Sequence, residues 1–326
     1  MRKIYILAGI ALLAIACNGS KRSSSEGKAE TSTTSSTEVT EQSYEAGTRR
    51  MKRPVESLSE IRDIETLNYV IEHYWDDFDY DCGERIIEYD TTDICQGLVD
   101  YASIVRLTGD LRPMRSFIER AETSRPVLEF FITISEMVLH DPNSPMRDDE
   151  LYIPILEHLV TSPLLDEYER LIPEHDLRIA SQNRIGMMAN DFEYTLADGT
   201  TGRLHDIDAD YTILMFNNPD CPMCREIIDE IGASPKLNEL QELGRVRIIA
   251  VYPDSDLEAW HRYHSQMPRQ WIVSYDDGSF LDNNDLYNLS AIPSLYLLDS
   301  MKRVIIKDGT SVMQIEDAIA YMETYN

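Results

Sequence analysis

The sequence has few basic residues: 30 Lys and Arg stand against 58 Asp and Glu in 326 residues, which gives a formal net charge of −28. Proteins that bind the phosphates of nucleic acids need clustered Lys and Arg. This chain lacks such clusters, so we exclude nucleic acid as a partner. The acidity keeps the protein soluble and favours the approach of cationic partners, at a rate that depends on salt.

Long apolar segments are also missing, apart from one near the N-terminus. The run from Ile4 to Ala16 follows Arg2 and Lys3 and is too short to span a bilayer comfortably as a permanent helix, so we interpret it as a secretion signal. The small residues of "LAIAC" directly before Cys17 resemble a bacterial lipoprotein signal over residues 1–17, in which this cysteine is lipidated and becomes the mature N-terminus. An ordinary cleaved signal, with Cys17 discarded, is the alternative. No other segment is long and apolar enough to cross a membrane.

Residues 18–52 have almost no large apolar side chains and are rich in Ser, Thr and Glu, so they cannot bury enough surface to fold. We predict a disordered tether with a root-mean-square reach on the order of 30 Å. Asn18 is not the aspartate that marks inner-membrane retention in many bacteria. The resemblance to lipoproteins therefore implies a lipid anchor in the outer membrane of the cell envelope, facing the periplasm, with display on the cell surface as the alternative.

Only five cysteines occur, namely Cys17 and two pairs. In an oxidising compartment, pairing is the expectation. Cys82 and Cys95 flank "GERIIEYDTTDI", a predicted connection between helices, so we predict a structural disulfide that contributes on the order of 3 kcal/mol. The alternative is that this pair is an internal substrate or relay for Cys221.

The spacing of apolar residues divides the rest of the chain into two regions. Residues 53–185 have helical period throughout, with prolines at plausible helix starts or connections, which predicts an all-α domain of short helices. Near Asn190 the period changes to two, and strands then alternate with helices to the C-terminus. Residues 186–326 are therefore predicted to form an α/β domain.

The other two cysteines lie in "FNNPDCPMCREI", where an apolar strand ends and a helix begins. Pro222 suits the first helical turn. Backbone N–H groups and the dipole at a helix N-terminus stabilise a thiolate, so the pKa of Cys221 should be lowered and Cys221 is the predicted nucleophile. Cys224, one turn later, is the predicted resolving thiol, and the exchange can run in either direction.

Two motifs resemble a known family. The segment "ANDFEYTLADGTTGRLHDIDADYTILMFNNPDCPMCREI", followed by "LSAIPSLYLLDSMKRVIIKDG", is similar to the thioredoxin-like fold of TlpA-like and ResA-like thiol-disulfide oxidoreductases. The resemblance implies a mixed sheet flanked by helices, with Pro293 as the cis-proline beside the redox cysteines and the backbone of Ile292 pairing with a bound peptide. It further implies exchange with protein thiols and disulfides, an electron-donating partner protein and no metal or organic cofactor. We favour reduction as the direction.

The helical half of the chain also resembles a domain found in other proteins. Through "VIEHYWDDFDYD" and "LHDPNSPMRDDELYIPILEHLVTSPLLDE" it is similar to an uncharacterised helical domain that precedes such modules in Bacteroidetes lipoproteins. This resemblance implies an architecture and not an activity. The acidic run "DDFDYD" lacks the spaced glycine and terminal glutamate of a calcium loop, so we interpret it as a solvated surface.

The sequence departs from the family at three positions near the cysteines. Asp220 stands where thioredoxins carry Trp, and Met215 stands where they carry a buried acid. Ile227 replaces a carboxylate of the ResA-like branch. The usual proton acceptor for the resolving thiol is therefore missing from its position.

Two charged residues near Cys221 should shift the pKa of its thiol in opposite directions. A negative Asp220 opposes formation of the thiolate, whereas Arg225 supports it. Pro222 and Met223, between the two cysteines, tune the redox potential in the family. The working potential of this pair is therefore a matter for measurement.

Other interpretations of Cys221 and Cys224 are a plain structural disulfide or half of a metal site. A zinc or copper site needs two more ligands, for which His261 and His264 are the candidates. A peroxiredoxin-like peroxidase shares the fold but requires Thr where Asn218 stands. A non-catalytic module would use the fold only to bind partners.

Overall fold

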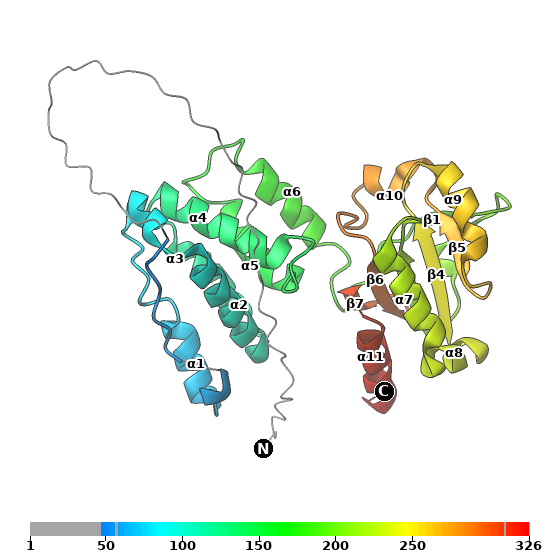
Figure 1. Cartoon of the computed structure of the whole chain (residues 1–326), viewed down its shortest axis with the longest axis horizontal. Helices are drawn as coiled ribbons and strands as arrows, with labels where there is room; N and C mark the ends of the chain where they lie inside the picture. Colours follow the sequence, from blue (N-terminus) through cyan, green and yellow to red (C-terminus); the bar gives the residue numbers. More distant parts are fainter. Residues whose placement is uncertain (1–46, 56–57, 310, 326) are drawn as a thin grey trace, which may run out of the picture. The chain divides into compact units, whose positions relative to one another are not determined.

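The computed structural model describes residues 47–55, 58–309 and 311–325. The predicted signal peptide, Cys17 and most of the predicted tether lie outside these residues. Within the described ranges, no helix is long and apolar enough to cross a membrane. A helical region comes first along the chain and an α/β region follows it (Figure 1).

Residues 47–52, predicted as the end of the tether, are held against the helical region. Arg49 forms an isolated β-bridge with Tyr89. Met51 is only 5% exposed, and its backbone N–H donates to the Asp93 carboxylate at 3.0 Å. The predicted tether boundary is therefore wrong for this segment, because its apolar and backbone groups find partners between Tyr89 and Asp93.

Short helices build the helical region, as the periodicity predicts. Their bounds are η1 (Leu58–Glu60), α1 (Ile64–His73), η2 (Gly83–Glu88), α2 (Thr91–Thr108), α3 (Arg112–Arg120), α4 (Arg125–Ser135), η3 (Glu136–His140), α5 (Asp149–Leu159) and α6 (Leu171–Ala180). The carboxylates of Asp63, Asp90 and Asp148 accept backbone N–H groups at the starts of α1, α2 and α5. Pro113 and Pro126 lie in the first turns of α3 and α4. These caps and prolines explain where the helices begin.

Aromatic side chains fill the centre of the helical region. Phe131, on α4, is fully buried, and its ring centroid lies 5.7 Å from that of Trp75, 4.8 Å from that of Phe78 and 5.1 Å from that of Phe117. All three pairs meet edge to face, the arrangement that aromatic rings prefer. The cluster joins α4 to α3 and to the segment after α1.

The predicted disulfide between Cys82 and Cys95 is not formed. Cys82 precedes η2 and is 5% exposed, with its Sγ 3.9 Å from the carbonyl oxygen of Gly83. Burial raises the pKa of its thiol. Cys95 lies in the second turn of α2 and packs against the helical core. The prediction is wrong because flanking a short connection in the sequence does not by itself bring two cysteines into the narrow geometry that a disulfide requires.

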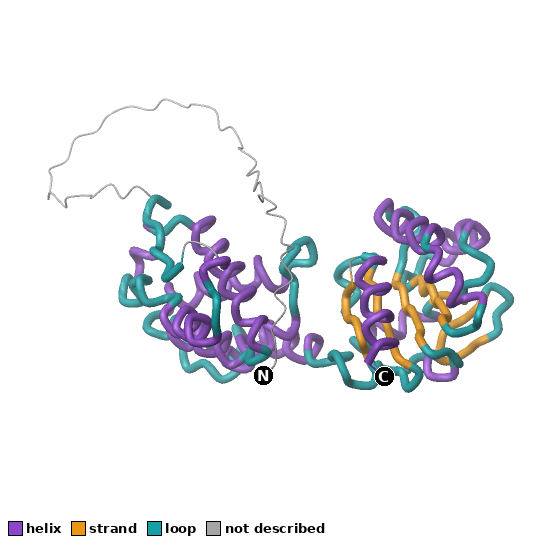
Figure 2. The backbone as a smooth tube through the Cα atoms, turned by 90° about the horizontal axis from the view of Figure 1, so that it is seen from below, coloured by secondary structure: helices purple, strands orange, loops and turns teal. Residues whose placement is uncertain are grey.

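A mixed seven-stranded sheet forms the centre of the α/β region, in the order β2-β1-β5-β4-β3-β6-β7. Its strands are the orange segments of Figure 2. The strands are β1 (Glu193–Leu196), β2 (Thr201–Arg203), β3 (Tyr211–Phe216), β4 (Val246–Tyr252), β5 (Ile272–Tyr275), β6 (Ser294–Asp299) and β7 (Val304–Gly309). Strands β3, β4 and β5 run parallel, and the other pairings are antiparallel. The predicted fold class, a mixed sheet flanked by helices after an all-α region, is confirmed.

Alternate side chains of β3 enter two different apolar clusters. Ile213 and Met215 pack with residues of α7 (Pro222–Ala233), α8 (Pro235–Glu242) and α11 (Val312–Tyr325). Leu214 and Phe216 pack on the other face, with residues that include Leu281 of α10 (Phe280–Asn283). All six residues of β3 are buried. The strand is thus a rigid support for the segment that follows it, which carries the two cysteines.

Charged groups connect the start of α5 with β7. Lys307 Nζ lies 2.7 Å from Asp149 Oδ2 and donates to two backbone carbonyls in the segment 180–182. Arg147 Nη2 lies 3.5 Å from Asp308 Oδ2. The apolar clusters of the helical and α/β regions have no residue in common. The contacts of Arg147 and Asp149 with β7 are thus ion pairs.

Candidate active site

Cys221 and Cys224 form a disulfide at the start of α7, with their Cα atoms 5.2 Å apart. Cys221 is the N-cap residue, Pro222 is the first residue of the helix as predicted, and the backbone N–H of Cys224 donates to Cys221 Sγ at 3.1 Å. An N–H group directed at sulfur at a helix N-terminus stabilises negative charge there. When the pair is reduced, this geometry favours the thiolate on Cys221.

The loop before β6 brings a second chain segment to the same sulfur. The peptide bond between Ile292 and Pro293 is cis, as the resemblance implies, and the carbonyl oxygen of Ile292 lies 3.7 Å from Cys221 Sγ. The register of the sheet accounts for this approach, because Phe216 of β3 pairs with Ser294 of β6. Residues far apart in sequence therefore meet where β3 ends and β6 begins.

The two cysteines differ in exposure. Cys221 is half-buried, whereas Cys224 is fully buried in an apolar cluster that also contains Met215 and Ile227. Met215 and Ile227, which stand where thioredoxins and ResA-like proteins carry acids, are thus part of the apolar core. Met223, between the cysteines, is 59% exposed. Cys221 is thus the more accessible of the two sulfurs, and the roles of nucleophile and resolving thiol stay predictions.

The order of alkylation tests these roles. In the reduced protein, iodoacetamide is expected to modify Cys221 at least about tenfold faster than Cys224 or Cys82, because Cys221 is accessible and its thiolate is stabilised. A time course followed by peptide mass spectrometry measures the three rates. In urea the rates should become similar. Faster native labelling of Cys224 would reverse the assignment of nucleophile and resolving thiol.

Asp220 and Arg225 are both exposed. The backbone N–H of Arg225 donates to the carbonyl of Cys221 at 3.3 Å. Burial raises the pKa of the Tyr263 hydroxyl, and the positive charge of the Arg225 guanidinium partly offsets this rise. Support of the Cys221 thiolate by the side chain of Arg225 stays a prediction.

His261 and His264, the candidate metal ligands, lie at the end of α9 (Leu257–Tyr263) and in the short turn η5 (His264–Gln266). The ring of His264 stacks on Trp260, with centroids 4.8 Å apart, and its Nδ1 lies 3.0 Å from the carbonyl oxygen of His261. Packing and a local hydrogen bond thus account for His264. Among the described residues, no group of three His, Cys, Asp or Glu is arranged to hold a metal ion.

A cavity of about 310 Å³ opens beside Cys221. It is lined by Asn218, Pro219, Asp220, Cys221, Tyr252, Asp254, Asp256 and Ala259. Sequence reasoning missed the four residues from 252 to 259. The parallel pairing of β3 with β4 explains their position, because parallel strands end at the same edge of a sheet. The aspartates of "PDSD" directly after an apolar strand were a visible feature, but the sequence did not show that this strand lies beside β3.

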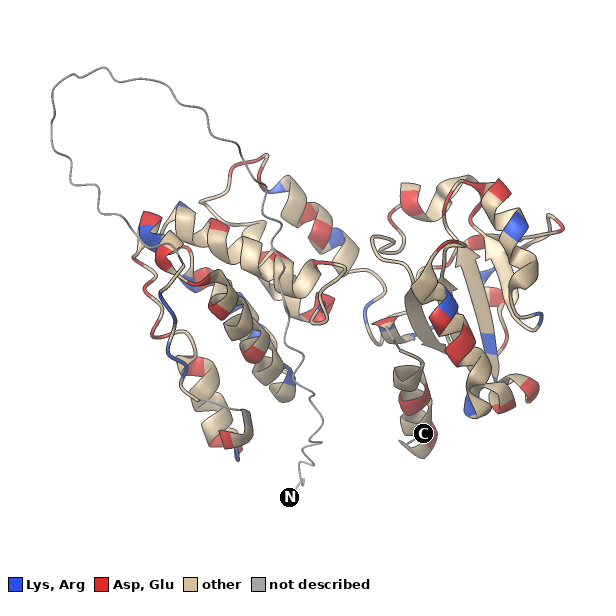
Figure 3. Ribbon diagram, in the orientation of Figure 1, with Lys and Arg blue, Asp and Glu red and all other residues tan. Residues whose placement is uncertain are grey.

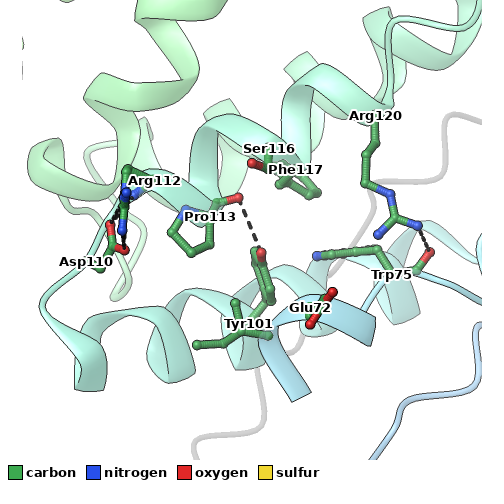
Figure 4. Close-up of a pocket in the computed structure, with 10 residues that line it drawn as sticks. Glu72, Trp75, Tyr101, Asp110, Arg112, Pro113, Ser116, Phe117 and Arg120 are labelled. Carbon is green, nitrogen blue, oxygen red and sulfur yellow. Dashed lines mark hydrogen bonds and ion pairs between the residues drawn. The ribbon is translucent and has the colours of Figure 1, made fainter. Parts of the chain in front are cut away.

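A larger cavity, of about 490 Å³, lies within the helical region (Figure 4). Its lining includes Trp75, Tyr101 and Phe117, and the Tyr101 hydroxyl donates to the carbonyl of Pro113 at 3.2 Å. No cysteine lines this cavity.

Comparison with known proteins agrees with this geometry. The model of a domain of unknown function (DUF5106) matches residues 17–183, and a model described as thioredoxin-like matches residues 208–304. The crystal structure of a thioredoxin-like protein from Bacteroides caccae is 32% identical, covers 84% of this chain and 99% of its own, and superimposes with a TM-score of 0.77. The chain belongs to the thioredoxin-like proteins and to the family of this domain of unknown function.

Other similar proteins match a smaller share of the present chain. The C-terminal domain of an uncharacterized protein from Bacteroides fragilis is 38% identical and covers 42% of this chain and 98% of its own, with a TM-score of 0.41. Nucleoredoxin from Danio rerio is 30% identical over 106 residues, which are 32% of this chain and 24% of that protein. The chain therefore spans about a quarter of the length of the nucleoredoxins it matches.

Proposed function

We propose that this protein is a thiol-disulfide oxidoreductase that exchanges disulfides with protein partners through Cys221 and Cys224. The observation that carries the proposal is the position of Cys221 Sγ, which accepts the N–H of Cys224 at 3.1 Å and lies 3.7 Å from the carbonyl of Ile292. The first contact stabilises a thiolate, and the second leaves a backbone edge beside the sulfur for an extended peptide. A disulfide with only a structural role needs neither a stabilised thiolate nor a peptide backbone beside its sulfur.

In the reducing direction, the thiolate of Cys221 attacks one sulfur of a partner's disulfide. An intermolecular S–S bond forms, the partner's S–S bond breaks, and the leaving thiolate takes a proton from solvent. Cys224, after losing its proton, then attacks Cys221 Sγ, which releases the second thiol of the partner and closes the internal disulfide. A dithiol protein must supply two electrons to reset the pair.

Residues 1–17 support a location in the cell envelope. We propose that Cys17 carries a lipid that anchors the chain in the outer membrane, facing the periplasm, where disulfides persist. Labelling with an alkyne fatty acid checks this, because Cys17→Ser should lose the label and leave the membrane fraction. Equal labelling of both proteins would remove the anchor from the proposal.

A trapping experiment tests the proposed exchange. Cys224→Ser is expected to retain the first attack and accumulate mixed disulfides through Cys221, because the resolving thiol is gone. Mass spectrometry after purification from cell envelopes identifies the trapped partners and the bonded cysteine. The Cys221→Ser/Cys224→Ser double variant is the control, and trapping by it at the same level would refute exchange through this pair.

The reduction potential of the Cys221 and Cys224 pair decides the direction. Equilibration with dithiothreitol buffers, followed by alkylation, measures it. A reductase is expected to have a potential near that of thioredoxin, about −270 mV. A value near about −120 mV, typical of a strong oxidant, would make the protein a donor of disulfides instead.

A further inference from the structure

The cavity beside Cys221 has an acidic lining. Three of its residues are carboxylates, Asp220, Asp254 and Asp256, and no Lys, Arg or His from the described part of the chain lines it. Acidic residues are spread over the rest of the chain as well (Figure 3), but these three stand at the entrance to the reactive sulfur. A substrate that reaches Cys221 through this cavity must therefore approach three negative charges.

The hydrogen bonds of two of these carboxylates come from backbone N–H groups and not from basic side chains. Asp254 accepts the backbone N–H of Ser255 at 2.6 Å, and Asp256 caps α9 by accepting the N–H of Ala259 at 3.0 Å. Across the described ranges of the chain, none of the three forms an ion pair. A cation brought by another molecule would be their first basic partner.

Tyr252 adds a polar side chain to the lining of this cavity. It is 3% exposed and lines the cavity, yet its hydroxyl forms no hydrogen bond with any described residue. Burial, with the charges of Asp254, Asp256 and Asp220, raises the pKa of this hydroxyl to about 12. It therefore keeps its proton and offers an unused donor, which the carbonyl of a bound peptide would accept.

We propose that this cavity selects disulfide substrates in which Lys or Arg flanks the reacting cysteine, with Asp254 and Asp256 attracting the cation and Tyr252 donating to the peptide backbone. This inference rests on the proposed disulfide exchange and names its substrate class. Opposite charges at an entrance raise the rate of encounter, and salt weakens the effect.

Single-turnover kinetics of the full chain tests the selection. The probes are three symmetrical disulfide dimers of one short peptide whose cysteine is flanked by Lys, Gln or Glu. The pre-reduced protein is mixed with each dimer, and acid quenching with mass analysis gives a second-order rate constant. Each constant is divided by that for dithiothreitol, which removes differences in the intrinsic reactivity of the peptides.

At low salt, the Lys dimer is expected to react about tenfold faster than the Gln dimer, and the Glu dimer more slowly still. Asp254→Asn/Asp256→Asn should reduce the Lys-to-Gln ratio to about threefold or less, and Asn at position 256 can still cap α9. Asp282→Asn/Asp317→Asn makes the same change in net charge at exposed positions outside the cavity and should leave the ratio unchanged.

Tyr252→Phe separates the backbone contact from the charge effect. It is expected to slow all three peptides by a similar factor of about three to five, because one hydrogen bond is lost, while the Lys-to-Gln ratio stays the same. An unchanged rate for every peptide would remove Tyr252 from the proposal.

Three outcomes contradict the proposal in different ways. A Lys-to-Gln ratio near one, with every dimer reacting, overturns the selection and leaves disulfide exchange standing. An equal fall of the ratio in both double variants assigns the effect to net charge and overturns the role of the cavity. Failure of all the dimers to oxidise the reduced protein overturns the proposed function and the selection with it.

Discussion

Replacing Cys221 with serine is expected to lower the rate of disulfide exchange on the order of a thousandfold or more, because a serine hydroxyl is not ionised near neutral pH and cannot attack a disulfide. The fold should not change, since Cys221 is half-buried and the serine Oγ can accept the same helix-capping N–H group. Insulin reduction in the presence of dithiothreitol measures the rate.

Cys224→Ser is the matched comparison. It removes a thiol from the same disulfide and leaves the attacking sulfur in place, so single-turnover formation of a mixed disulfide should continue while multiple turnover stops. The two variants thus separate attack from resolution. If Cys221→Ser kept more than about a tenth of the wild-type rate, attack by Cys221 would be wrong.

The second large effect concerns stability. Phe131→Ala is expected to lower the free energy of unfolding by about 3–5 kcal/mol, because the ring is fully buried among Trp75, Phe78 and Phe117 and its removal leaves a cavity. Urea denaturation, followed by far-ultraviolet circular dichroism, measures the change.

Phe280→Ala is the control for this substitution. Its side chain is 50% exposed, so the same truncation should cost less than about 1 kcal/mol. A loss at Phe131 as small as that at Phe280 would contradict the description of the aromatic cluster as the centre of the helical region.

Local patterns were enough to predict much of the fold. The change of apolar period near Asn190 separated helical from α/β structure, and the strand, Pro222 and the two cysteines predicted a helix N-terminus at a reactive pair. These features depend on residues close together in sequence, where backbone preference and burial act directly. The structure confirms the helical region, the mixed sheet and the start of α7.

The missed features depend on pairing between distant segments. Tyr252 and Asp254 reach Cys221 only because β4 lies parallel beside β3, and no local pattern gives that order. The error at Cys82 and Cys95 has the same origin, because pairing depends on how the segments that carry the two cysteines pack, which their spacing in the sequence does not give. Met51 likewise has no local signal, since its burial is provided by residues about forty positions away.

The contact of Lys307 and Asp308 with Asp149 and Arg147 has a practical meaning for protein engineering. Charged groups accept water in place of a lost partner, whereas apolar groups do not. Cutting the chain between the two regions would separate the ion pairs that Lys307 and Asp308 form with Asp149 and Arg147, and would leave these four charged side chains open to water. The α/β region is thus a suitable starting point for a separate redox domain in fusion proteins.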